Sequence, residues 1–180
     1  TDTATVINSA LASLTTGGSV FIKKGNYSLS SNILVPSNVS IIGEGMGNTI
    51  FIQEANVGFK NYDYTTIGNC DIHISNITID AQALYDVCIQ YRGVQDSSIK
   101  NVVFKNTRSV ASGPSVALGI VGLNSVETRN IQIRNCFFNN IGNYAINLDP
   151  VSVLQVLKDI QVIKNQFYNA QTGVACQRNI

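Results

Sequence analysis

Hydrophobic positions in the first part of the chain recur at the spacing of a helix. Between residues 3 and 16, the apolar side chains that lie three or four positions apart are Val6, Ile7, Ala10, Leu11 and Leu14. This spacing places them on one face of an α-helix. Asp2 is suited to cap its N-terminus, and Gly17 and Gly18 are suited to end it, because glycine accepts a left-handed backbone. We therefore predict an amphipathic helix over residues 3–16.

From residue 19 onward the pattern changes to short apolar runs with alternating positions. The first runs are 20–22, 27–29, 33–35, 39–41 and 50–52, with Gly, Pro and Asn residues between them. Short runs that are bounded by such turn residues are typical of β-strands. We predict β-structure over residues 19–180.

A frame of six residues recurs four times in this β-region. It reads apolar, any, Asn, any, any, apolar, and its asparagines are Asn76, Asn101, Asn135 and Asn165. Successive copies start 25, 34 and 30 residues apart, and a second apolar run follows each copy, at 87–91, 116–120, 144–148 and 173–177. One such unit has too little apolar surface to fold alone, whereas stacked units share one core. The repeat therefore predicts a solenoid of stacked β-coils.

Asparagine suits the corners of such a solenoid, because it tolerates left-handed backbone angles and its amide can bond to the amide of the next coil. The rival interpretation is an antiparallel β-sandwich. The shortage of two-residue hairpin turns argues against that rival.

Composition excludes several classes of function. The chain has 180 residues, 44% of them hydrophobic, which is enough for one domain with a core. Only 13% are charged and the net charge is +1, so we expect no nucleic-acid partner. No apolar run reaches the roughly 20 residues of a membrane-spanning helix, so we also expect no membrane span.

The cysteines do not form a metal-binding pattern. They are Cys70, Cys88, Cys136 and Cys176, which form no Cys-x-x-Cys pair, and the single histidine, His73, is not part of a Cys/His cluster. A zinc site is therefore not expected. Two interpretations stay open: four small buried hydrophobic residues, or one disulfide whose pairing the sequence does not specify.

Several motifs at the N-terminus follow one another in a recognisable order. They are an acidic start with threonine, a helix, a Gly-Gly pair, a Gly-x-Tyr turn and a Gly-x-Gly turn, at Thr1–Thr3, 3–16, Gly17–Gly18, Gly25–Tyr27 and Gly43–Gly45. This order resembles the entry module of the right-handed parallel β-helix superfamily typified by pectate and pectin lyases. The resemblance implies an all-β, right-handed parallel β-helix with one N-terminal capping α-helix. It also implies a polysaccharide or surface glycan as the partner, and a location outside the cell or on a cell or virion surface.

The two ends of the sequence differ from that superfamily. Its members carry a strand and a Gly-Asp-Gly stretch before the Thr-Asp, and the end at 177–180 has no capping segment. We treat residues 1–180 as one β-helix domain. We expect a fragment of a longer chain, or a protein whose ends are covered by a neighbour.

The resemblance also points to a binding surface, because substrates of the superfamily lie along the sheet that is formed by the second run of each coil. Strand alternation then turns Cys88 and Ala145 outward together with the polar residues, and Val174 and Cys176 inward. The polar residues that we expect to line the groove are Gln90, Arg92, Asn147, Asp149, Tyr144 and Gln177. We assign Asp149 and Arg92 as catalytic candidates and the other four as substrate-binding residues.

Three reactions known for this superfamily each need particular groups on this surface. Glycoside hydrolysis needs two placed carboxylates, and only Asp86 and Asp149 are candidates. A lyase needs a base, for which Arg92, Arg134 or Lys164 are candidates, and often Ca²⁺, for which the sequence offers no clear ligand cluster. The stretch from Tyr144 to Asp149 and Pro150 is similar to alginate epimerases, but Val151 stands where those enzymes have histidine. The catalytic signature is therefore incomplete in this segment.

Two hypotheses about function follow. The first is an extracellular β-helix protein that binds or processes a polysaccharide, as a lyase, hydrolase or epimerase would, with no cofactor assigned. The second is a non-catalytic structural module of a tailspike, surface layer or filament, which self-associates through its coil ends into a homo-oligomer or filament.

Overall fold

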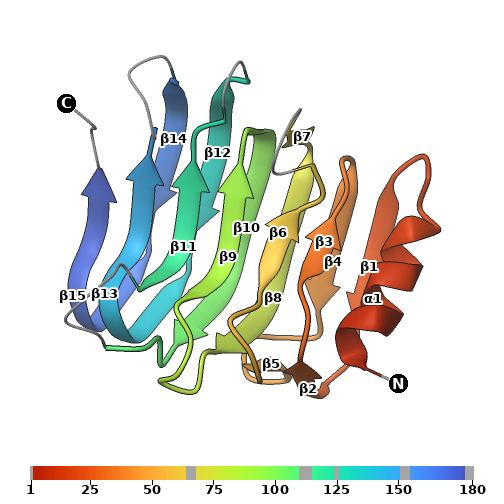
Figure 1. The fold of residues 1–180 in the computed structure, drawn as a ribbon, viewed down its shortest axis with the longest axis horizontal. Helices are drawn as coiled ribbons and strands as arrows, with labels where there is room; N and C mark the ends of the chain where they lie inside the picture. The colour runs from red at the N-terminus through yellow and green to blue at the C-terminus, as the bar shows by residue number, and fades with distance from the viewer. Residues whose placement is uncertain (1, 64–67, 110–114, 124–125, 151–154, 177–180) are drawn as a thin grey trace.

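The computed structural model describes residues 2–63, 68–109, 115–123, 126–150 and 155–176. It is a parallel β-solenoid with one short N-terminal helix, as the repeat and the resemblance predicted (Figure 1). The helix is α1 (Thr3–Ala12), and the strands are β1 (Gly18–Ile22), β2 (Gly25–Leu29), β3 (Ile33–Val35), β4 (Val39–Gly43), β5 (Thr49–Gln53), β6 (Phe59–Asn61), β7 (Asn69–Cys70), β8 (Ile72–Asp80), β9 (Val87–Arg92), β10 (Val94–Lys105), β11 (Val116–Val121), β12 (Thr128–Arg134), β13 (Phe137–Asp149), β14 (Leu157–Ile163) and β15 (Gln166–Cys176).

The named strands pair in parallel, so the chain winds in one direction and does not reverse into hairpins. Ile74 lies opposite Ile99 and Ile99 opposite Ile133, which stacks equivalent residues of successive coils in columns. These columns form the core. An example is the stack of Phe104, Phe138 and Phe167, with ring centroids 4.7 and 5.1 Å apart. The parallel pairing excludes the antiparallel β-sandwich.

Two faces of the solenoid are used below. The front face consists of β3, β6, β9, β11 and the C-terminal parts of β13 and β15, which lie side by side in coil order in Figure 1. The rear face consists of β1, β4, β12, β14 and the N-terminal parts of β8 and β10.

The helix is shorter than predicted. Asp2 caps α1 by accepting a hydrogen bond from the Thr5 backbone, as expected, but α1 ends at Ala12 and not at residue 16. Ser13 explains the early end, because both its backbone N–H and its hydroxyl donate to the Ala10 carbonyl, at 3.2 and 2.7 Å. Such local bonds compete with continued helix. Asn8 ties α1 to the first coil by donating to Asn32 O and accepting from Leu34 N.

The asparagines occupy left-handed corners, with one correction. Asn76, Asn101 and Asn135 have φ of 58°, 53° and 54°, and Asn101 Nδ2 donates to Asn76 Oδ1 at 3.0 Å. In the last coil the left-handed residue is Lys164, with φ of 54°, and not Asn165.

The strand register explains this shift of one residue. Arg134 pairs with Ile163 and Phe137 with Gln166, so the residue of the last coil that lies opposite Cys136 is Asn165. There Asn165 accepts from the Cys136 backbone N–H at 2.8 Å and donates to the Ile133 carbonyl at 2.9 Å. It therefore bonds to the backbone of the preceding coil and does not stack on Asn135.

The structure also bears on the expectations about the cysteines and about a membrane span. All four cysteines are free thiols: Cys88 and Cys136 are buried, as small hydrophobic residues would be, whereas Cys70 and Cys176 are exposed. Within the described ranges, no helix has the length and apolar character that crossing a membrane requires.

Candidate functional site

The front face brings the predicted site residues into two rows that run across the strands. The first row contains Lys60, Gln90, Gly119, Asn147 and Ala175, and the second contains Arg92, Val121 and Asp149. Neighbouring strands are about 4.8 Å apart, so Gln90 and Asn147 lie about 10 Å apart along the first row. Arg92 and Asp149 have the same separation in the second row.

The first row contains two amides with a glycine between them. Asn147 is only 7% exposed, and its Oδ1 is buried without a hydrogen-bond partner. A Cβ added at Gly119 would meet its nearest neighbours, Val121, Val116 and Gln90, at 3.7–3.9 Å, which are ordinary contacts. A side chain as small as a methyl group would therefore fit at this position, and Gly119 itself is buried, like the other residues of β11.

The second row carries a guanidinium that lacks an acidic partner. Arg92 forms no ion pair within the described part of the chain, and its Nε is buried without a hydrogen-bond acceptor. Asp86, which could have neutralised it, is bound instead by Arg108, at 3.0 and 2.8 Å. Arg92 is thus placed to bind an oxyanion.

Lys60 belongs to this site, although we did not predict it. It lies on β6 directly opposite Gln90, and burial lowers the pKa of its ammonium group. The sequence carries little signal for it, because Asn61 is polar although it is buried, and a strand of three residues is too short to stand out.

Among the described residues, no other predicted position lies in these two rows. Tyr144 is half-buried in β13 beside Val116 and Thr172, at the start of the face. Gln177 lies outside the described residues. Cys88 and Ala145 were expected outside and are 0% exposed.

In the last described coil, residues that were expected inside are exposed. Val174 was expected inside and is 41% exposed, and Cys176 is also exposed. Among the described strands β15 pairs with β13 alone, so no further coil covers its inner side chains.

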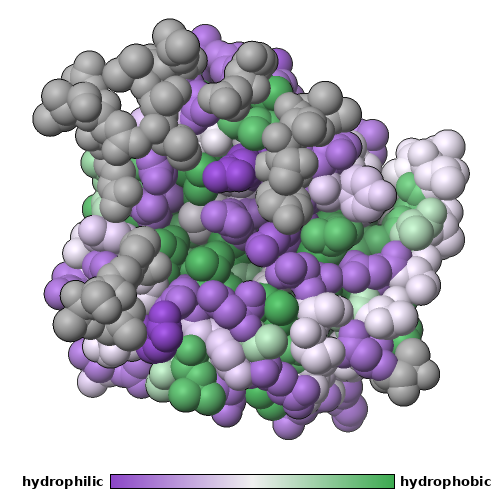
Figure 2. All heavy atoms as spheres, in the orientation of Figure 1, coloured by the Kyte–Doolittle hydropathy of each residue, from purple (hydrophilic) through white to green (hydrophobic). Residues whose placement is uncertain are grey.

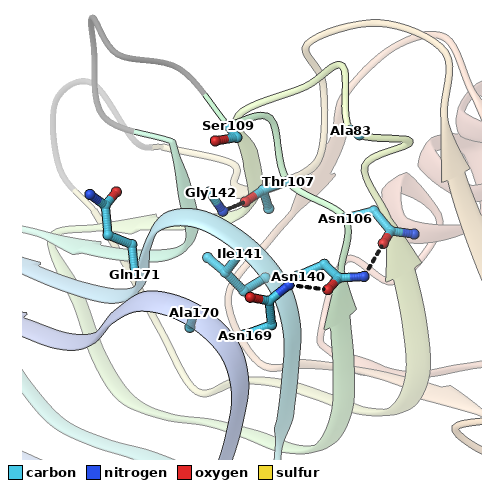
Figure 3. Close-up of a pocket in the computed structure, with 10 residues that line it drawn as sticks. All are labelled: Ala83, Asn106, Thr107, Ser109, Asn140, Ile141, Gly142, Asn169, Ala170 and Gln171. Carbon is cyan, nitrogen blue, oxygen red and sulfur yellow. Dashed lines mark hydrogen bonds between the residues drawn. The ribbon is translucent and has the colours of Figure 1, made fainter.

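A cleft that the sequence did not indicate lies at a corner of the solenoid, next to a ladder of amides. Asn169 donates to Asn140 at 2.7 Å, Asn140 to Asn106 at 3.2 Å, and Asn106 to Asp80 at 3.0 Å. Figure 3 shows the asparagines along one wall of this cleft of about 550 Å³, with Ile141 and Ala170 beside them. Each amide donates a hydrogen bond to the preceding coil, so the ladder contributes to the stacking of the coils.

The front face is mixed in polarity. Figure 2, drawn in the same orientation, shows hydrophilic and hydrophobic residues side by side across it. The two carboxylates considered for hydrolysis do not act together, since Asp86 is held by Arg108. No group of three potential metal ligands occurs in the described part of the chain, so the structure offers no support for a calcium site there.

Residues 1–180 match the family model described as "Rhamnogalacturonase A/epimerase, pectate lyase-like". No curated protein matches the sequence significantly. The fold is similar to ORF18 of Geobacillus virus E2 (TM-score 0.61, 18% identity), with 93% of this chain and 39% of that chain covered. It is also similar to the A-module of the mannuronan C-5 epimerase AlgE4 of Azotobacter vinelandii (TM-score 0.54, 15% identity), with 98% and 66% covered.

A third similar structure is the pre-mature gene product 12 of bacteriophage phi29 (TM-score 0.50, 13% identity), with 98% of this chain and 32% of that chain covered. The present chain thus spans about a third of the length of the two phage proteins and two thirds of the epimerase module. At these identities the similarity concerns the fold alone.

Proposed function

Because the chain belongs to the rhamnogalacturonase A/epimerase, pectate lyase-like family, we propose that its front face binds an acidic polysaccharide. The observation that carries this proposal is the pair of rows across β6, β9, β11 and β13, which contain two cations and two amides on either side of the buried residues Gly119 and Val121 of β11. Hydroxyl groups of a sugar would bond to Gln90 and Asn147, and a uronate carboxylate to Arg92 and Lys60. The location that goes with this proposal is outside the cell or on a virion surface.

The spacing of the rows supports a chain-like ligand. Adjacent strands are about 4.8 Å apart, which is comparable to the length of one sugar unit. A polysaccharide that runs across the strands would therefore present one unit to roughly each coil. The buried, unpaired Oδ1 of Asn147 and Nε of Arg92 would gain the partners that they lack.

We propose binding rather than cleavage as the role of this segment. Asp149 and Arg92 remain the catalytic candidates, but both Asp-based hydrolysis and epimerisation would need a second proton-transferring group beside Asp149. Asp86, one candidate, already forms an ion pair with Arg108. A complete catalytic set would have to include residues outside this segment.

The test is binding by affinity electrophoresis and calorimetry to polygalacturonate, alginate and neutral dextran. We expect binding to the two polyuronates, which falls roughly tenfold in Arg92→Gln, since one charge-assisted contact is lost. Lys24→Gln, at an exposed turn residue between β1 and β2, is the matched control and should retain affinity. Equal binding to dextran, or equal loss in Lys24→Gln, would contradict the proposal.

Catalysis is measured in the same samples. Unsaturated products would indicate a lyase, new reducing ends a hydrolase, and a changed uronate composition an epimerase. Activity that disappears in Asp149→Asn while polyuronate binding persists would show that the segment is catalytic and that its role had been proposed too narrowly.

A further inference from the structure

The rear face carries two cations side by side. Lys100 of β10 lies directly opposite Arg134 of β12, so both side chains leave the same face of neighbouring strands. Ser75 flanks Lys100 on one side and Ile163 flanks Arg134 on the other, so neither flanking residue brings a negative charge. Like charges that are directly opposite each other destabilise a sheet.

No acid compensates these two charges within the described part of the chain. Three other cations do form ion pairs: Lys105 with Asp80, Arg108 with Asp86, and Arg129 with Glu127. Arg134 instead keeps its Nε buried and without a hydrogen-bond acceptor. A guanidinium placed in this way can offer two parallel N–H donors to an oxyanion.

A second polar row runs beside the cations, two residues away along the same strands. Its members, in register from one strand to the next, are Ser40, His73, Ser98, Gln132 and Gln161. His73 is held between Asp71 and Ser98, at 2.9 Å from each. The rear face therefore combines cations with a row of hydroxyl, imidazole and amide groups, which is the combination that an acidic sugar requires.

We propose that Lys100 and Arg134 form a second binding site, which takes the carboxylate or sulfate group of an acidic glycan chain on the rear face. The site is separate from the front face, because its residues lie on β10 and β12 and none of them belongs to the rows of Gln90 and Arg92. The second polar row binds hydroxyl groups of the same chain. The protein would thus hold glycan on two faces.

The experiment compares two pairs of cations that occupy the same sheet. Lys100→Gln/Arg134→Gln removes the proposed site. Arg129→Gln/Lys158→Gln removes another pair in register, of which Arg129 is already bound by Glu127 at 3.3 Å. Each double variant loses two positive charges, so net charge is matched. Both are made in the wild-type and in the Arg92→Gln background, and affinities for polygalacturonate, dextran sulfate, dextran and duplex DNA are measured.

We expect Lys100→Gln/Arg134→Gln to weaken polyanionic glycan binding by about tenfold or more in the Arg92→Gln background, where the front face is impaired, and by less in the wild-type background; the control pair should change it by less than about twofold in both. The stronger response of polygalacturonate or of dextran sulfate identifies the anionic group as carboxylate or sulfate. Equal loss in both pairs, no loss in the first pair, or DNA binding as tight as glycan binding would overturn the proposal. Because the two backgrounds are compared, loss through Arg92 alone would overturn this site and leave the front-face proposal standing.

A single variant keeps the test independent of folding. Lys100→Glu would supply Arg134 with an acidic partner from within the protein. We expect its melting temperature to equal or exceed that of the wild type, while glycan binding on the rear face is lost. A Lys100→Glu protein that still binds the glycan with wild-type affinity in the Arg92→Gln background would refute the proposed role of the two cations.

Discussion

Replacing Asn101 tests whether the amide ladder stabilises the stack of coils. Asn101 has a left-handed backbone, with φ of 53°, and its Nδ2 donates to Asn76 Oδ1 at 3.0 Å. Asn101→Ala loses this hydrogen bond, which is worth about 1 kcal/mol, and puts a Cβ without a compensating amide into a conformation that costs about 1–2 kcal/mol. The free energy of unfolding should fall by about 2–3 kcal/mol.

Urea unfolding followed by far-ultraviolet circular dichroism measures this loss. With a slope of about 2 kcal/mol per molar urea, the midpoint should fall by about 1 M. Gln132→Ala is the control, because Gln132 is half-buried on the rear face and has an ordinary strand backbone. Its effect should stay within about 0.5 kcal/mol.

A double-mutant cycle isolates the hydrogen bond from the backbone strain. Asn76→Gly and Asn101→Gly both remove the bond and keep a relaxed left-handed backbone. The double variant should therefore cost about 1 kcal/mol less than the sum of the single variants. Strict additivity of the two glycine variants, or an Asn101→Ala protein as stable as the control, would refute the reasoning.

Three further predictions concern packing, register and thiol burial. Gly142→Ala should destabilise the fold by about 1–3 kcal/mol in urea, because its Cβ would lie 2.0 Å from the Arg108 carbonyl oxygen, whereas Gly47→Ala, with nothing within 4 Å, should not. Lys164→Asn should raise stability by about 0.5–1 kcal/mol in the same assay, because asparagine tolerates the left-handed backbone and would lie over Asn135; an unchanged or lower midpoint would contradict the register. A thiol-specific reagent should react quickly with the exposed Cys70 and Cys176 in the native protein, and with the buried Cys88 and Cys136 only on unfolding. Burial also raises the pKa of Cys136 to about 11, which slows its reaction further. Four equally fast thiols would contradict the burial.

The sequence predicts the coils well because the repeat and the physical requirement coincide. A left-handed corner favours Asn, Asp or Gly, and the frames at Asn76, Asn101 and Asn135 mark three such corners correctly. The frame that contains Asn165 is misleading by one residue. Its apolar positions fit both possible alignments, and only the pairing of Phe138 with Phe167 decides between them.

Side-chain direction was harder to predict than the strands themselves. Strict alternation turns Cys88 and Ala145 outward, yet both are 0% exposed. Both lie at the beginning of the front-face part of their strands, next to a corner. Burial there depends on the adjoining segments, as shown by the 4.0 Å contact between Cys88 Sγ and Gln53 Oε1. Such contacts join residues 35 apart, which no local pattern of the sequence specifies.

The corners and the faces of the solenoid use polar groups in different ways. At the corners, the amides of Asn101, Asn106 and Asn140 bond to the coil before them, so their polarity contributes to stacking. On the faces, Arg92 and Arg134 each keep a buried Nε without an acceptor. A buried donor that lacks a partner costs about 1–3 kcal/mol, and a ligand recovers that energy if the side chain turns so that the donor reaches an acceptor on the ligand. The groups that weaken the isolated fold are therefore the ones with most to gain from an anionic ligand, which is why we assign binding to the faces and stability to the corners.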